Sequence, residues 1–339
     1  MSKKYFAVKD IHQLVVKALT NHKTASEHAD QIADALVAAE IDGQKGHGLS
    51  RLPSYCEQAA SGKVNGFISP VVSQVATAAI VVDARYGFAY PALARAVDEM
   101  VKLTPKTGIA VAAVKNSHHC GMAGYHVEKL ARKGLVGLLF ANTPKAIAPW
   151  GGQRGIFGTN PIALAVPRQS REPMVIDLAL SKVARGKIMI AARDNKEIPE
   201  GWALDATGQS TTDPKAALAG TMAPIGGAKG AALVLIVEIL AAALTASNFG
   251  FEATSFFEAD GKSPGVGQLL VAFAPEPLSG GQFSIKVESL FKEILSQGNT
   301  RLPGERKLTL RQAAAQKGIS LTGAQHALIQ KLAGESSKA

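Results

Sequence analysis

Three strand-like segments follow one another between residues 135 and 178 with no helix between them. They are the short apolar runs 135–140, 161–166 and 174–178. Parallel neighbours in a sheet need a crossover of a dozen or more residues, usually helical, whereas antiparallel neighbours need only a loop. This stretch therefore predicts an antiparallel or mixed sheet and disfavours a regular βαβ chain.

The remaining pattern predicts an α/β fold with helical segments at both ends. Further strands are expected at 79–83, 108–114 and 268–273, with helices at 91–103 and 123–133. Two helices should open the chain, the second introduced by a capping box from Thr24 to Glu27, and a third should follow Pro53. The apolar run 231–246 contains Glu238 and is shorter than the roughly 20 residues that cross a bilayer, so it predicts a buried helix.

Composition limits the class of protein without deciding its ligand. Apolar residues make up 47% of the chain and charged residues 19%, which is typical of a soluble enzyme and gives no sign of a membrane protein. The first residues lack an apolar run, and Cys56 and Cys120 are the only cysteines, so we expect a cytoplasmic protein without a metal site. A net charge of +10 attracts anions, which include nucleic acid, a phosphorylated cofactor and a carboxylate substrate.

A polar turn follows the strand expected at 108–114. It contains Ser117, His118, His119, Cys120, Gly121, Met122, Ala123 and Gly124, and leads into a helix. Backbone N–H groups at a helix start attract anionic oxygens, and imidazoles serve as acid or base. The same residues could also be a structural turn with hydrogen-bonded histidines.

No standard nucleotide motif is present. Neither a Gly-x-Gly-x-x-Gly after the first strand nor a P-loop occurs, so a nucleotide site would use other turns. One candidate is Gly226-Gly227-Ala228-Lys229-Gly230, where Lys229 could meet a phosphate, and another is 303–307. Taken alone, either turn could equally be a helix cap.

His47 and Arg51 lie four residues apart in a glycine-rich loop. If residues 49 onward are helical, the guanidinium and imidazole face one cleft, where Arg suits a carboxylate and His suits proton transfer. The scattered histidines disfavour a metal site, and the missing Gly-x-Ser-x-Gly disfavours a serine hydrolase. Asp177 could be catalytic or a structural anchor at a strand end.

Residues 308–332 resemble two helices around a turn, as in a DNA-binding helix-turn-helix. Few Lys or Arg residues occur in the second helix, and phosphate binding needs several cations. We therefore favour a structural segment, with nucleic-acid binding as a distant alternative.

Together these segments resemble the malate/L-lactate dehydrogenase-like family of NAD(P)H oxidoreductases, which includes sulfolactate dehydrogenases and the Δ1-piperideine-2-carboxylate/Δ1-pyrroline-2-carboxylate reductases. The resemblance spans nearly the whole chain. Its motifs are Asp42-Gly43, His47-Gly48-Leu49-Ser50-Arg51, Asn116-Ser117-His118-His119-Cys120-Gly121, Ala148-Pro149-Trp150-Gly151-Gly152, Gly158-Thr159-Asn160-Pro161, Ile176-Asp177 and Gly227-Ala228-Lys229-Gly230.

The resemblance implies a non-Rossmann cofactor domain at 76–284, a helical lobe of 1–75 with 285–339 for substrate and dimer contacts, and a homodimer. It implies that either His47 or His119 is the proton donor, that Ser50 assists, and that Arg51, Tyr55 and Asn160 contact substrate. The implied NADPH contacts are Ser117, Cys120, Gly121, Met122, Ala123, Gly124, Thr159, Asp177, Leu178, Ala179, Lys229, Glu305, Arg306, Lys307 and Arg311.

Two departures bear on the substrate. Many relatives carry Ser where this chain has Gly46, so Ser50, water or His119 would replace a proton relay. The late turn continues Ala231-Ala232-Leu233, which resembles cyclic imine reductases more than hydroxy-acid dehydrogenases. We therefore expect NADPH-dependent reduction of small cyclic 2-imino carboxylates to L-proline or L-pipecolate, with a 2-hydroxy-acid dehydrogenase as the alternative. The cations Arg306, Lys307 and Arg311 favour NADPH over NADH, which stays a second hydride donor.

Overall fold

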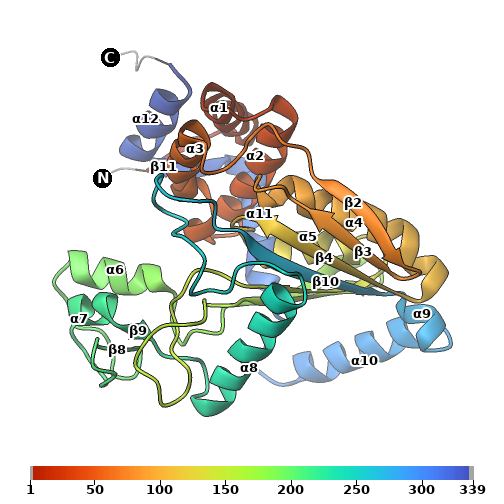
Figure 1. Cartoon of the computed structure of the whole chain (residues 1–339). Coiled ribbons are helices and arrows are strands. Elements are labelled where there is room, and N and C mark those ends of the chain that lie inside the picture. The colour runs from red at the N-terminus through yellow and green to blue at the C-terminus, as the bar shows by residue number, and fades with distance from the viewer. Residues whose placement is uncertain (1–2, 336–339) are drawn as a thin grey trace.

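A seven-stranded sheet forms the centre of the computed structural model, which describes residues 3–335 (Figure 1). The strand order is β2-β3-β4-β10-β5-β6-β7. Their bounds are β2 Val71–Ala76, β3 Ala79–Asp83, β4 Ile109–Ser117, β5 Val136–Ala141, β6 Ile162–Arg168, β7 Arg171–Leu178 and β10 Val266–Phe273. Two small two-stranded sheets pair β1 (Lys3–Phe6) with β11 (Ile319–Thr322) and β8 (Ala203–Leu204) with β9 (Thr221–Met222).

The sheet is mixed, as the sequence predicts. Strands β3 and β4 are parallel and are joined by a long helix, α4 (Ala89–Thr107). Every other neighbouring pair is antiparallel, including β5 with β6 and β6 with β7. The three consecutive strands expected between 135 and 178 are therefore confirmed.

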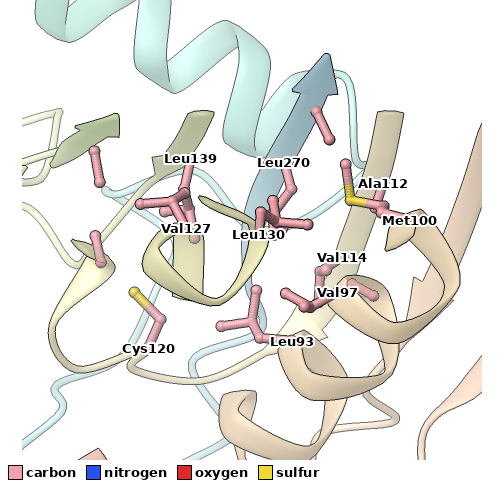
Figure 2. Close-up of a cluster of buried hydrophobic side chains, with 14 of the residues drawn as sticks. Leu93, Val97, Met100, Ala112, Val114, Cys120, Val127, Leu130, Leu139 and Leu270 are labelled. Atoms are coloured by element: carbon pink, nitrogen blue, oxygen red, sulfur yellow. The ribbon is translucent and has the colours of Figure 1, made fainter. Parts of the chain in front are cut away.

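One face of the sheet packs against α4 and α5 (Ala123–Ala131). Alternate strand residues such as Ala112, Val114, Leu139 and Leu270 point to this side, because successive side chains of a strand face opposite ways. Figure 2 shows them meeting Leu93, Val97 and Met100 of α4 and Val127 and Leu130 of α5.

The opposite face is covered by α8 (Ala228–Glu238), by the π-helical turn η3 (Ile239–Ala243) and by α10 (Phe283–Ser296). Val234 and Val237 pack inward from α8. Leu233, Leu235, Ile236 and Ile239 are instead 42–51% exposed. The buried helix predicted at 231–246 is therefore correct for one face only, and the other face is apolar and exposed.

The N-terminal helices α1 (Val8–Asn21), α2 (Ser26–Ile41) and α3 (Leu52–Ser61) share a second core with β11 and α12 (Gly323–Leu332). The predicted capping box is wrong, because α2 starts after Ala25 without a side-chain cap and the buried Thr24 hydroxyl has no partner in residues 3–335. Helices α11 (Glu305–Lys317) and α12 are separated by β11, which pairs with β1. A strand thus replaces the tight turn of a helix-turn-helix.

Two elements that we assigned to the helical lobe lie on or in the large sheet. Strand β2 is its edge, and Phe291 of α10 packs against Val166 and Met174. The division into two lobes stays a prediction. The remaining helices are α6 (Arg185–Arg193), α7 (Pro214–Ala219) and α9 (Pro275–Leu278).

The polar Ser and Lys content of residues 334–339 predicts fraying, and residues 336–339 of this tail lie outside the described residues. Between residues 3 and 335, no helix has both the length and the apolar character needed to cross a lipid bilayer.

Candidate active site

His47 and Arg51 lie on two consecutive 3-10 turns, η1 (Lys45–His47) and η2 (Leu49–Arg51), that connect α2 to α3. The buried carboxylate of Glu40 accepts a hydrogen bond from the Leu49 backbone N–H at 3.2 Å. A Cβ at Gly48 would lie 2.6 Å from that carboxylate, so glycine permits the close approach. This contact holds the loop against the end of α2.

The two candidate proton donors lie together. The imidazole rings of His47 and His119 stack with centroids 5.3 Å apart and planes 17° apart. Nδ1 of His119 is 2.6 Å from the Tyr55 hydroxyl, which is 3.0 Å from the Tyr90 hydroxyl. The sequence does not predict that these four residues meet, because they come from four different elements or turns.

Arg51 is held beside these rings. Its Nε donates to the Gly46 carbonyl at 2.8 Å, and its guanidinium carbon lies 4.3 Å from the centre of the Phe257 ring. Its NH1 nitrogen is buried without a partner in the described part of the chain. A half-buried guanidinium with an unpaired nitrogen is suited to hold a carboxylate.

Both histidines are neutral near pH 7. Burial, followed by the charge of Arg51, lowers the pKa of His47 to about 4. The same two causes, with smaller contributions from His47 and His118, hold the pKa of His119 well below its usual value. Burial raises the pKa of Tyr55. Arg51 is therefore the charged group beside the two neutral imidazoles.

The candidate cofactor residues converge on the carboxyl end of β7. The Gly124 backbone N–H, in the first turn of α5, donates to the Asp177 carboxylate at 2.7 Å. After β7, the backbone of Leu180 bonds to both Thr159 and Ile225, each at 2.8 Å. The start of α11 also belongs here, because a Cβ at Gly304 would lie 3.0 Å from the Val175 carbonyl.

The three cations of α11 differ in their surroundings. Lys307 reaches Glu128 at 2.6 Å, and Arg311 spans Glu128 at 2.5 Å and Asp42 at 2.6 Å. These two residues thus form an ion-pair network rather than a free basic cluster. Arg306 is exposed and makes no ion pair within residues 3–335.

The network acidifies Glu128. Burial alone would raise its pKa, but the hydrogen bonds and charges of Arg311 and Lys307 lower the pKa to about 2. Glu128 therefore stays ionised inside the fold. Lys229 differs from these residues because it is exposed in the first turn of α8, where Gly227 supplies no side-chain cap.

Asn160 is fully buried with φ of 42°. Its amide nitrogen donates to Glu238 at 2.7 Å and to the Val234 carbonyl at 3.1 Å. Because both partners accept, the oxygen Oδ1 is left without a hydrogen bond among the described residues. Asn160 can therefore offer a ligand only an acceptor.

Several expected residues are placed differently from the prediction. Ser50 is exposed and donates to the Lys45 carbonyl at 2.6 Å, with no hydrogen bond to either histidine in residues 3–335. Tyr55 has no exposed surface and supports His119 instead of lining an open pocket. The remaining expected cofactor positions comprise buried residues (Ser117, Cys120, Met122 and Ala123), Gly121 with φ of 67°, exposed Leu178 and Ala179, and Glu305 at the start of α11.

Sequence reasoning missed the aromatic surroundings of the histidines. Phe256 lies 5.1 Å from His119 between ring centroids, and Phe257 stacks under Arg51. The Gln58 amide oxygen is 2.9 Å from Nε2 of His118. These residues carry no local motif, and only the folded chain brings them to the site. Within the described residues, no group of three His, Cys, Asp or Glu side chains is arranged to hold a metal ion.

Comparison with known proteins gives consistent matches over nearly the full chain. Residues 6–330 match the malate/L-lactate dehydrogenase family. A (2R)-3-sulfolactate dehydrogenase (NADP+) from Chromohalobacter salexigens is 50% identical, covering 93% of each chain. A Δ1-pyrroline-2-carboxylate/Δ1-piperideine-2-carboxylate reductase from Pseudomonas putida is 40% identical over 92% of each. The crystal structure of Δ1-piperideine-2-carboxylate reductase from Pseudomonas syringae pv. tomato superposes with a TM-score of 0.92 at 37% identity, covering 97% of this chain and 99% of that one.

Proposed function

Because this chain belongs to the malate/L-lactate dehydrogenase family, we propose that it is an NADPH-dependent oxidoreductase that reduces C2 of a small 2-imino or 2-oxo carboxylate. The observation that carries this proposal is the group of half-buried Arg51 and His47 with buried His119, which combines one cation suited to a carboxylate with two neutral imidazoles.

The residues around β7 fit a phosphorylated dinucleotide. Helix α8 begins without a side-chain cap, and a helix N-terminus favours phosphate oxygens. Lys229 and Arg306 are exposed cations suited to phosphate groups, with Arg306 the candidate for a 2′-phosphate. Bound NADPH would supply the hydride. We further propose that this mixed sheet is a cofactor domain distinct from the Rossmann type, since only β3 and β4 pair in parallel.

The chain's own residues bind and orient the substrate. Arg51 holds the carboxylate through its unpaired NH1 nitrogen, and the stacked Phe257 keeps the guanidinium in place. Phe256 and Tyr55 pack around His119 and shield its imidazole from water. Holding the reacting groups in a fixed arrangement lowers the barrier to transfer. Asn160 Oδ1 offers an acceptor beside the Thr159 turn.

Our first candidate substrates are cyclic 2-imino acids, namely Δ1-pyrroline-2-carboxylate and Δ1-piperideine-2-carboxylate. An imine can arrive already protonated on nitrogen, so it depends less on an oriented proton relay at His47 than a ketone does. Nδ1 of His47 is buried without a hydrogen-bond partner in residues 3–335, which agrees with a weak relay there. The imine reductases among the relatives support the same class.

The second candidate is a 2-hydroxy acid such as 3-sulfolactate, favoured by the 50% identity to the Chromohalobacter enzyme. That compound carries a sulfonate besides its carboxylate. A surface cavity lined by Lys145, Arg154 and Phe251 offers two cations that form no ion pair among the described residues. Lys145 N–H bonds to the Gly250 carbonyl, in the loop that continues to Phe256 and Phe257.

A substrate panel distinguishes these candidates. Purified protein and NADPH would be supplied with Δ1-pyrroline-2-carboxylate, Δ1-piperideine-2-carboxylate, 3-sulfopyruvate, pyruvate and oxaloacetate, and NADPH oxidation would be followed by absorbance. We expect the imines to give the highest kcat/KM. Efficient 3-sulfopyruvate reduction without imine turnover would replace the first candidate by the second. Salt-dependent DNA binding without any NADPH oxidation would instead favour the nucleic-acid alternative.

Arg51 has its own test. Arg51→Ala should raise the substrate KM strongly, and Arg51→Lys should not restore it, because an ammonium cannot replace the planar guanidinium. The KM for NADPH serves as the internal control and should change little. An unchanged substrate KM in both variants would exclude the carboxylate role.

We also propose that the protein is a cytoplasmic homodimer. Beyond Lys229, the exposed face of α8 and η3 is apolar, with Leu233, Leu235, Ile236 and Ile239 on it and exposed Leu244 directly after η3. A helix that is apolar on all sides is normally covered by protein. A second copy of the chain would bury this face.

A further inference from the structure

The hydroxyl groups of Tyr90 and Tyr55 and the ring of His119 form a buried line of hydrogen bonds. The Tyr90 and Tyr55 oxygens are 3.0 Å apart, and the Tyr55 oxygen is 2.6 Å from Nδ1 of His119. Tyr55 is fully buried and Tyr90 is 3% exposed. Gly121 makes room for this line, because a Cβ there would lie 2.4 Å from the Tyr90 oxygen.

Each buried hydroxyl proton needs an acceptor, and this requirement sets which group donates in each of these hydrogen bonds. Among residues 3–335, the Tyr90 hydroxyl has no hydrogen-bond partner other than Tyr55. Its proton is satisfied only if it points to the Tyr55 oxygen. A buried donor without an acceptor costs free energy, so the reverse direction is disfavoured. The Tyr55 proton must then point to the remaining acceptor, Nδ1 of His119.

This direction fixes the tautomer of His119. A neutral imidazole carries one proton, and Nδ1 is occupied as an acceptor, so the proton lies on Nε2. No residue in the described part of the chain bonds to Nε2, and this atom is not among the fully buried unpaired ones. His119 therefore presents an N–H to the open side of the site.

His47 lacks a comparable arrangement. Its Nδ1 is buried with no hydrogen-bond partner among residues 3–335, so nothing holds its tautomer or ring orientation through hydrogen bonds. The stacked rings are therefore not equivalent, although they lie 5.3 Å apart. One is oriented by two tyrosines, and the other is not.

We propose that Tyr90 and Tyr55 are positioning residues that hold His119 as the Nε2–H tautomer, and that this N–H donates to a substrate oxygen. The inference rests on the proposed function only for the identity of that oxygen, which is the carbonyl of a 2-oxo acid or the carboxylate of an imino acid. His119, rather than His47, is then the hydrogen-bond donor to the substrate. The arrangement is that of a catalytic group oriented by a further residue behind it.

The tautomer can be measured without any substrate. In protein labelled with ¹⁵N-histidine, long-range ¹H–¹⁵N spectra separate a protonated ring nitrogen from an unprotonated one, and His119→Gln identifies the signals. We expect Nε2 of His119 to be protonated in the wild-type protein and to lose this clear preference in Tyr55→Phe, which removes the hydroxyl that donates to Nδ1. Protonation on Nδ1 in the wild-type protein, or an unchanged spectrum in Tyr55→Phe, would overturn the proposal whatever the substrate is.

Kinetics test the donor role separately. The amide nitrogen of Gln can replace Nε2, whereas that of Asn lies nearer Nδ1, so kcat of His119→Gln should exceed that of His119→Asn by about tenfold. Tyr55→Phe should lower kcat about threefold to tenfold with the KM for NADPH unchanged. Tyr86→Phe, which removes an exposed hydroxyl, is the control. Equal kcat in the two His119 variants would contradict donation from Nε2.

Discussion

Helices α5 and α8 start in a similar way, but the surroundings of their first turns differ. Both follow a glycine-containing turn, and neither has a side-chain cap. The first turn of α5 is closed by the chain itself, since Asp177 accepts the Gly124 N–H. In the next turn, Arg311 and Lys307 neutralise Glu128. The first turn of α8 leaves Lys229 exposed, and its outer face is apolar.

The difference shows what each helix contributes. Helix α5 is locked between the sheet and α11 by ion pairs in residues that are largely buried, so it is suited to hold a fixed ligand position. Helix α8 has an exposed cation at one end and an exposed apolar face along its length, so we expect it to contact partners from outside the chain. The following changes test this contrast.

Arg311→Ala should have the largest effect. It would leave the carboxylate of Asp42, whose side chain is 1% exposed, without its partner and would weaken the neutralisation of Glu128. Removing one partner of a buried pair costs about 3 to 5 kcal/mol, so the free energy of unfolding in denaturant should fall by that amount. Arg95→Ala breaks an exposed pair with Glu99 and should change it by less than about 0.5 kcal/mol. Similar losses in both variants would show that α5 is not locked by this network.

Ile236→Glu should disrupt the contact that we expect between the exposed face of α8 and a second copy of the chain. A carboxylate in a dimer interface is unfavourable, and we expect self-association to weaken at least about a hundredfold, or ~2.7 kcal/mol. Sedimentation velocity over a concentration series measures it. Leu278→Glu changes another exposed leucine, on α9, and should leave association intact. A wild-type protein that stays monomeric would disprove the role of this face.

Lowering the pH should reduce the free energy of unfolding, because the stabilising contribution of ionised Glu128 in α5 is lost. Its pKa is lowered from 4.5 to about 2 in the folded chain, so its contribution is present above pH 4.5 and is lost as pH falls towards 2. Between pH 6 and pH 3 the wild-type protein should lose roughly 2 kcal/mol more stability than Glu128→Gln, which cannot titrate at this position. Denaturant unfolding at each pH measures the difference. Parallel pH profiles would mean that Glu128 is not held ionised by Arg311 and Lys307.

Lys229→Ala should have the smallest effect. An exposed cation is screened by water, so we expect the KM for NADPH to rise about threefold to tenfold, or ~1 kcal/mol, with kcat little changed. Lys215 provides a matched control, because it lies in the first turn of α7, where Asp213 caps the helix. An equal effect of Lys215→Ala would argue against a phosphate site at the start of α8.

Much of the central sheet could be predicted from local sequence. Strand β3 has the predicted bounds, and β4, β5, β6, β7 and β10 overlap their predicted segments. Each is an apolar run between turn residues, and burial on both faces makes such runs distinctive. The edge strand β2 and the short strand β1 were missed because they are exposed or brief.

Helix boundaries depended more on tertiary contacts. The pattern from Thr24 to Glu27 contains the residue types of a capping box, yet α2 begins at Ser26 without that cap. A true capping box occurs at Thr322 with Gln325, where β11 fixes the preceding residues against β1. Capping needs a backbone direction that neighbouring elements supply.

The sequence by itself determined the mixed sheet, the residues of the histidine and arginine motifs, and the glycine turns, because these depend on residue type and short spacing. Only the tertiary structure decided which groups meet. It stacked His47 on His119, aligned Tyr55 and Tyr90 behind one ring, and paired Arg311 with Asp42 and Glu128. Those partners are 35 to 269 residues apart, and hydrogen bonds and ion pairs of that range follow from packing, which local patterns do not encode.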